Sequence, residues 1–203
     1  MYTRLAPLYG FWAHWAEGKA RRLALDLASV RNGDSVLEVG VGTGSAFREL
    51  AAKNPRGLTV GVDLTPAMLR RTAGSFRGSS LPVPPLCQCD SRFLPFGDGA
   101  FDLVYSAYML DALSVGDIET ALGEMQRVLK PSGRLVLINL SLRNRWFNGL
   151  WGALCWVIPN LLGGCRPIRI VSHLAVLGLT VLEHRHITEG GVPSEVILAR
   201  KEG

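Results

Sequence analysis

The sequence predicts an α/β fold: a doubly wound sheet of seven strands, mostly parallel, with helices on both faces and a C-terminal antiparallel β-hairpin. Three observations lead to this prediction. Short strand-like runs alternate with helical runs along the chain. Most of the strand-like runs are rich in Val, Leu or Ile without strict alternation, which is typical of strands buried on both faces. The last two runs are joined by the glycine- and proline-containing connector "TEGGVP".

Each element can be justified in chain order. The first five expected strands cover 35–40, 58–63, 85–90, 101–106 and 133–140. The expected helices cover 44–54, 65–76, 115–130 and a stretch near 170–177. Thr65 is a good N-cap and Pro66 a good first helical residue, and Pro131 stops the third helix. The hairpin pairs strands over 179–187 and 194–201.

Composition narrows the class of protein. The 203 residues are enough for one domain with a full core, and 48% apolar against 19% charged residues is globular. The net charge of +5 is diffuse and contains no basic block, so nucleic acid is not an expected partner. The cysteines form no CxxC pair and no secretory signal is visible, so reduced thiols in a cytoplasmic protein are expected.

The run "VLEVGVGTG" over 36–44 is the most informative stretch. Its glycines are Gly40, Gly42 and Gly44. They allow a ligand to approach the backbone, and the following helix start offers free N–H groups. The spacing is GxGxG rather than the GxGxxG of nicotinamide sites. Glu38 would repel a pyrophosphate but attract a cation, and S-adenosylmethionine carries a sulfonium and an ammonium group without any phosphate.

A second carboxylate, Asp63, ends the next strand-like run. In a doubly wound sheet, this position lies at the strand tip beside the ligand crevice. An alternative is that Asp63 ends the strand or caps the helix that begins near Thr65. The corresponding alternative for Glu38 is a structural acid that pairs with N–H groups of the loop.

These motifs resemble those of class I S-adenosylmethionine-dependent methyltransferases of type 11, which have a Rossmann-like fold. The most similar branch includes the quinone C-methyltransferases of ubiquinone and menaquinone synthesis and the bacterial phospholipid N-methyltransferases. The resemblance covers about residues 2–201. It is carried by "VLEVGVGTG", "GVDLTPAML", "CDSRFLPFGDGAFDLVYSAYML" and "EMQRVLKPSGRLVLI".

The resemblance implies how the methionine part of S-adenosylmethionine is held. The glycine loop would wrap it, and Glu38 would lie near its amino group. Ser106, at the tip of the fourth strand, would lie close to the sulfonium. The family's "YD" signature appears here as Tyr9 followed by glycine, and Tyr9 would close over the cofactor.

The same resemblance implies the nucleoside contacts. Asp63 would accept hydrogen bonds from both ribose hydroxyls. Leu64 and Met68 would line the adenosine pocket. Asp90 would hold the adenine amino group, with Ser91 beside it.

The acceptor is expected near two aromatic segments. All five tryptophans lie in the N-terminal stretch or in the apolar run 146–164. The expected substrate-binding residues are Trp12, Trp15, Trp146, Trp151 and Arg166. Tryptophans flanked by arginines suit an apolar acceptor or an anionic membrane surface, to which the chain would bind peripherally. The alternative is that the tryptophans seal a small core and the arginines are solvated.

Methyl transfer is an in-line displacement, so the protein must chiefly align the acceptor and exclude water. A general base is needed only if the acceptor loses a proton, and the candidates are Asp111, Tyr108 and His14. Capping, packing or a structural role is the alternative for each. His184 and His186 share one face of a predicted strand but lack a third ligand, so no metal is predicted.

The sequence thus predicts a methyltransferase of lipid metabolism acting on a small hydrophobic or lipid-like acceptor, either a phospholipid headgroup or a quinone. A non-catalytic cofactor-binding scaffold or partner subunit is one alternative. An NAD-dependent oxidoreductase is another, although it would need GxGxxG and a Tyr/Lys pair.

The expected parts of the single domain, 1–203, are a lid helix (1–30), a cofactor-binding core (31–141), an apolar cap (142–166) and a helix with hairpin (167–203).

Overall fold

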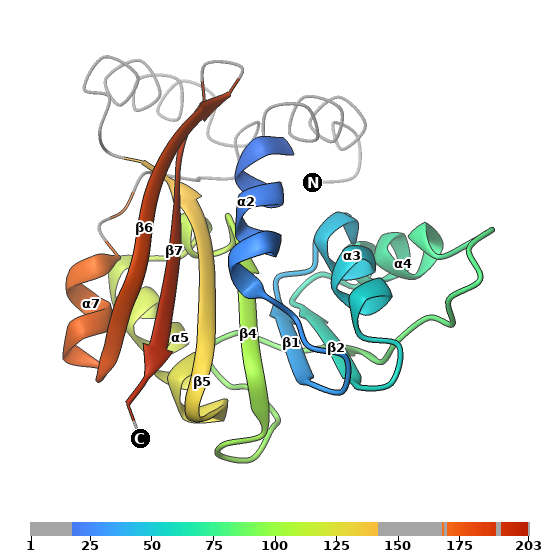
Figure 1. The fold of residues 1–203 in the computed structure, drawn as a ribbon, viewed down its shortest axis with the longest axis horizontal. Coiled ribbons are helices and arrows are strands. Elements are labelled where there is room, and N and C mark those ends of the chain that lie inside the picture. Colours follow the sequence, from blue (N-terminus) through green and yellow to red (C-terminus); the bar gives the residue numbers. More distant parts are fainter. Residues whose placement is uncertain (1–17, 142–167, 169, 190–191, 203) are drawn as a thin grey trace.

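The computed structural model describes residues 18–141, 168, 170–189 and 192–202, and it contains one seven-stranded sheet in the order β3-β2-β1-β4-β5-β7-β6 (Figure 1). The strands are β1 (Ser35–Val39), β2 (Leu58–Asp63), β3 (Leu86–Gln88), β4 (Phe101–Ala107), β5 (Leu129–Leu140), β6 (Leu179–Glu189) and β7 (Val192–Lys201). The helices are α2 (Gly18–Ala28), α3 (Ser45–Lys53), α4 (Pro66–Ser75), the 3₁₀ helix η1 (Leu110–Ala112), α5 (Val115–Val128) and α7 (Val171–Val176).

The strand directions confirm the predicted fold class. Strands β1 to β5 pair in parallel, whereas β7 pairs antiparallel with both β5 and β6. Most boundaries differ by one or two residues, and the largest difference is at β5: the helix expected to reach Lys130 ends at Val128, and β5 already begins at Leu129. Pro131 explains the difference, because a residue before proline is disfavoured in the helical conformation.

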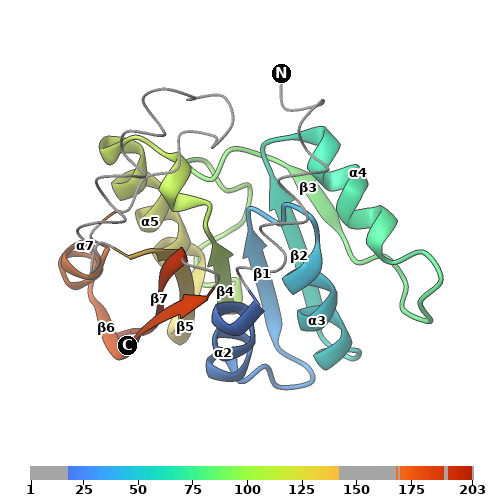
Figure 2. The ribbon, with the colours of Figure 1, turned by 90° about the horizontal axis from the view of Figure 1, so that it is seen from above.

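Apolar side chains cover the sheet on both faces. Residues of α5 and α7 pack on one face, around Leu37 and Leu137. Residues of α2 and α3 pack on the other, around Val36 and Tyr105. Figure 2 shows the sheet between these two sets of helices. Burial on both faces accounts for the nearly continuous apolar strands.

Helix α2 is the described part of the expected lid, and it lies along the sheet against β5 and β7 (Figure 1). Its buried face is narrow and built from Ala20, Ala24, Leu25 and Ala28, so the helix can approach the strands closely. Residues 1–17 and the expected cap over 142–166 lie outside the described residues. Within the described part of the chain, none of the helices combines the length and apolar character needed to cross a bilayer.

Candidate cofactor site

The glycine loop connects β1 to α3, where the strand order reverses between β1 and its neighbour β4. Ligands of doubly wound sheets bind beside this reversal. Gly40, Gly42 and Gly44 have φ angles of 83°, 52° and 80°, a region that favours glycine. A Cβ atom on Gly40 would lie 2.8 Å from the Met109 Cβ, and one on Gly44 would lie 2.9 Å from the Thr72 Cα. Gly40 and Gly44 are therefore required for both conformation and space, whereas Gly42 is favoured by its conformation alone.

Replacing Gly40 with alanine is expected to lower the free energy of unfolding by about 1–3 kcal/mol, because the left-handed backbone and the contact with Met109 both oppose a side chain. Gly123→Ala is the matched control. Gly123 lies inside α5 with open space around its Cα, so alanine there is expected to stabilise by about 0.5–1 kcal/mol. Urea unfolding of both variants measures the contrast, and equal behaviour would contradict the strained loop.

Glu38 is a carboxylate inside the sheet, between Gly61 of β2 and Tyr105 of β4. Its side chain is 2% exposed, and among the described residues its Oε2 has no hydrogen-bond partner. Burial raises the pKa of Glu38 well above its ordinary value, the nearby Asp63 raises it further, and Arg21 opposes the shift. A buried carboxylate oxygen without a partner is costly, and a cationic ligand is one way to satisfy it.

Asp63 at the tip of β2 joins the glycine loop to the start of α4. Its Oδ2 accepts a hydrogen bond from the Gly42 N–H (3.0 Å), and its Oδ1 accepts one from the Thr65 N–H (2.8 Å). The strand-ending role considered for Asp63 is therefore present. Each carboxylate oxygen can accept a second hydrogen bond, so the same side chain can also receive ligand hydroxyls.

Leu64 and Met68 follow Asp63 at the beginning of α4. Leu64 is 64% exposed, although it is a large apolar residue. Met68 is half-buried in the first turn of the helix. An exposed leucine beside the carboxylate suits the apolar face of a nucleoside ring.

Asp90 lies just beyond β3 and forms an ion pair with Arg92. The guanidinium of Arg92 donates to both of its oxygens, with Arg92 Nη2 at 2.7 Å from Oδ2, and also contacts Asp117 at 2.8 Å. Hydrogen bonds from Arg92 lower the pKa of Asp90. Ser91, between the two, is half-buried. Asp90 is therefore held ionised by a partner that the sequence pattern did not indicate.

The candidates on and after β4 have mainly structural contacts in this structure. The buried Ser106 hydroxyl donates to the Val39 carbonyl (2.8 Å), joining β4 to β1. Asp111 in η1 is fully buried and accepts the Leu140 N–H at 3.1 Å. Tyr108, in contrast, lies at the tip of β4 with φ 54°, an uncommon conformation for a non-glycine residue.

The hydroxyl of Tyr108 lies 2.8 Å from the Ser194 Oγ, which connects the tip of β4 to the start of β7.

The remaining site predictions fall outside the described residues: His14, Tyr9, Trp12, Trp15, Trp146, Trp151 and Arg166. Sequence reasoning also missed Met109 and Arg21. Neither has a local signal, because only the packing of η1 on the loop and of α2 on the sheet brings them near Gly40 and Glu38.

Comparisons with known proteins agree with this geometry. A family model described as "Methyltransferase domain" matches residues 36–133. A demethylmenaquinone methyltransferase of Thermus thermophilus is 36% identical over 142 residues, covering 68% of this chain and 63% of that protein. The chain spans about half to two-thirds of the length of the curated relatives it matches.

Two solved structures show the same fold. A Bacillus halodurans protein described as a putative methyltransferase has a TM-score of 0.78 at 18% identity, covering 92% of this chain and 100% of the other. The N-methyltransferase NodS of Bradyrhizobium japonicum, in complex with S-adenosyl-L-homocysteine, has a TM-score of 0.71 at 19% identity, covering 92% and 88%.

The cofactor of this class, S-adenosylmethionine, fits the residues present. The loop has three left-handed glycines, of which Gly40 and Gly44 leave no room for a side chain, and the Glu38 Oε2 without a partner among the described residues suits the positive charge of the cofactor. The sheet order, the glycine loop and the sequence matches agree: residues 36–133 match a methyltransferase domain, and the described part of the chain has the fold of the solved methyltransferases named above.

Proposed function

We propose that this protein transfers a methyl group from S-adenosylmethionine to a small apolar acceptor of the quinone type. The observation that carries the proposal is the buried, unsatisfied Oε2 of Glu38, which lies on β1 just before a loop of three left-handed glycines. A dinucleotide would bring phosphate to this carboxylate and repel it, whereas an ammonium or sulfonium would be attracted.

Bound S-adenosylmethionine supplies a methyl group on a positively charged sulfur. Glu38 would hold the ammonium end and Asp63 the ribose hydroxyls, while Leu64 would cover the adenine. The two acids lie on neighbouring strands, and the Gly42 N–H of the loop that follows β1 donates to Asp63. This contact would help to fix the spacing between the groups that hold the two ends of the ligand. The contribution of the chain is to orient the cofactor and exclude water.

We infer a quinone-type acceptor rather than a phospholipid headgroup because the matched relative from Thermus thermophilus is a demethylmenaquinone methyltransferase. Methylation of a ring carbon requires loss of a proton. The position of Tyr108 just beyond β4, at the same end of the sheet as the glycine loop, supports it as the candidate residue near this step. Asp111 is a poorer candidate, since it is enclosed and holds the Leu140 N–H.

The test is incubation of the full chain with S-adenosylmethionine labelled on its methyl group, in separate reactions with demethylmenaquinone and with mixed phospholipids. Label in a methylated quinone is the expected result, and Asp63→Ala should reduce it at least about tenfold. Label in phospholipid alone would overturn the acceptor. Tight cofactor binding without transfer to either would instead support a non-catalytic scaffold.

A further inference from the structure

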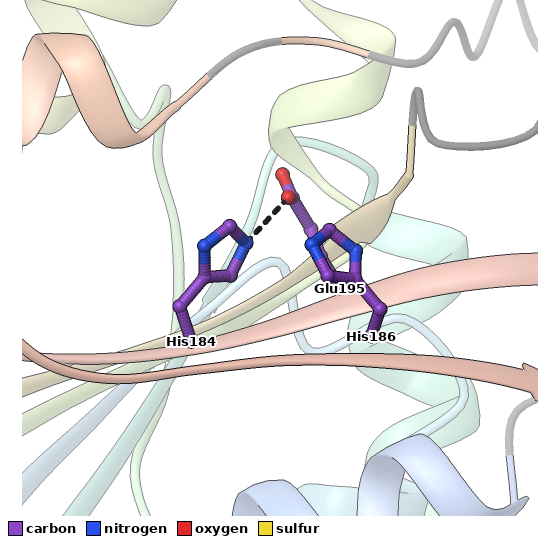
Figure 3. Close-up of side chains that lie close together, drawn as sticks. All are labelled: His184, His186 and Glu195. Carbon is purple, nitrogen blue, oxygen red and sulfur yellow. Dashed lines mark hydrogen bonds and ion pairs between the residues drawn. The ribbon is translucent and has the colours of Figure 1, made fainter.

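The β6–β7 hairpin carries a cluster that the proposed methyl transfer does not use. His184 and His186 are two residues apart on β6, so both rings project from the same face. Glu195 on β7 is the register partner of His186 and a diagonal neighbour of His184. Figure 3 shows the three side chains gathered on one side of the hairpin.

The geometry is that of three ligands around one point. His184 Nε2 lies 2.9 Å from Glu195 Oε2, and one ligand atom from each residue lies within 4.8 Å of the others. In a tetrahedral zinc site with bonds of about 2.0–2.1 Å, ligand atoms are about 3.3–3.5 Å apart. The three ligand atoms therefore lie near the spacing of such a site, and both histidines are exposed on the surface of the hairpin.

The carboxylate is the unusual member of the cluster. Glu195 is 6% exposed, and in the described part of the structure its Oε1 has no hydrogen-bond partner. Burial raises the pKa of Glu195, and the neighbouring His184 opposes that shift. A single hydrogen bond to an imidazole thus leaves half of a buried carboxylate unsatisfied, and a cation would supply the missing partner.

An outer contact orients one of the rings. The Nδ1 atom of His186 lies 2.9 Å from the Ser141 Oγ. When Nδ1 donates to that oxygen, the lone pair of the ring is on Nε2, the atom that would bind a metal. Fixing the ring through its second nitrogen is a recurrent feature of histidine metal ligands.

We propose that His184, His186 and Glu195 form a binding site for a divalent transition-metal ion, with Zn²⁺ as the reference ion. Two imidazoles and one carboxylate are suitable zinc ligands, and a water molecule would complete the coordination. A hydrogen-bonded His184–Glu195 ion pair without metal affinity is the competing explanation.

The test uses tag-free, chelator-treated full chain titrated with Co²⁺, whose visible absorption reports tetrahedral coordination, and with Zn²⁺ in competition. One Co²⁺ per chain, displaced by Zn²⁺, is expected. Glu195→Gln keeps the shape of the side chain, so it should melt like the wild type without metal yet bind Co²⁺ more than about a hundredfold more weakly. Ser141→Ala should weaken binding about tenfold.

Two controls separate this site from other metal-binding groups. His173 on α7 pairs with Glu119 and lies outside the cluster, so His173→Ala should bind Co²⁺ normally. The same holds for the double variant Cys87→Ser, Cys89→Ser, which removes two half-buried thiols. Absence of Co²⁺ binding in the wild type, or full binding in Glu195→Gln, would overturn the proposal. Neither readout depends on methyl transfer, so the two proposals fail separately.

Discussion

Asp63→Ala is expected to weaken S-adenosylmethionine binding at least about tenfold. In the free protein the substitution removes the acceptor of the Gly42 N–H and of the Thr65 N–H, so the glycine loop loses its connection to β2. In the complex it also removes the proposed hydrogen bonds to the ribose. Each charge-assisted bond contributes about 1.5–3 kcal/mol, so losing one is already enough for a tenfold effect.

Calorimetric titration with S-adenosylmethionine measures this loss. Asp98→Ala is the matched control, because the Asp98 side chain is 82% exposed and contacts Arg127 away from the loop. The control should retain wild-type affinity. An Asp63→Ala protein that melts like the wild type and binds the cofactor with unchanged affinity would show that Asp63 only ends the strand.

Glu38→Gln is expected to affect stability and cofactor binding in opposite directions. Because burial raises the pKa of Glu38, the stability it contributes is complete below its unfolded pKa of about 4.3 and is lost as the pH rises through the raised folded pKa. Glutamine cannot ionise, so the variant should be more stable than the wild type at high pH and similar to it near pH 4. Urea unfolding across this range measures the difference.

The same substitution should weaken S-adenosylmethionine binding about 10- to 100-fold, through loss of a charge-assisted contact of about 1.5–3 kcal/mol. A cationic ligand lowers the pKa of Glu38, so binding to the wild type should release a proton and weaken as the pH falls. Calorimetry in buffers of different ionisation enthalpy counts that proton. If Glu38→Gln released as many protons on cofactor binding as the wild type, the proton would come from another group. Glu119→Gln, which replaces an exposed acid on α5, is the control.

The fold was predictable because its signals are local. Apolar runs ending at Val39 and Asp63 mark buried parallel strands, and the glycines of the loop are required by their own φ angles. The start of β5 was placed too late because Leu129 and Lys130 extend a helical pattern, and only pairing of Leu129 with Phe101 reveals the strand.

Much of the site depends on contacts between distant segments. Arg92 forms an ion pair with Asp90 across a turn, and no sequence motif predicts the geometry of that turn. Glu195 joins the two histidines only through the register of the hairpin, which is why the sequence indicated two ligands and no third. Arg21 lowers the pKa of Glu38 because α2 packs on the sheet near that residue. The sequence pattern does not show which helix packs on which strands.

The most direct measurement is a pair of calorimetric titrations of the full chain, one with S-adenosylmethionine and one with NAD. One S-adenosylmethionine should bind per chain with release of a proton, and NAD should give no heat of binding. Saturable binding of NAD, or no binding of S-adenosylmethionine, would contradict the claim that the loop after β1 and its two acids hold a cationic nucleoside.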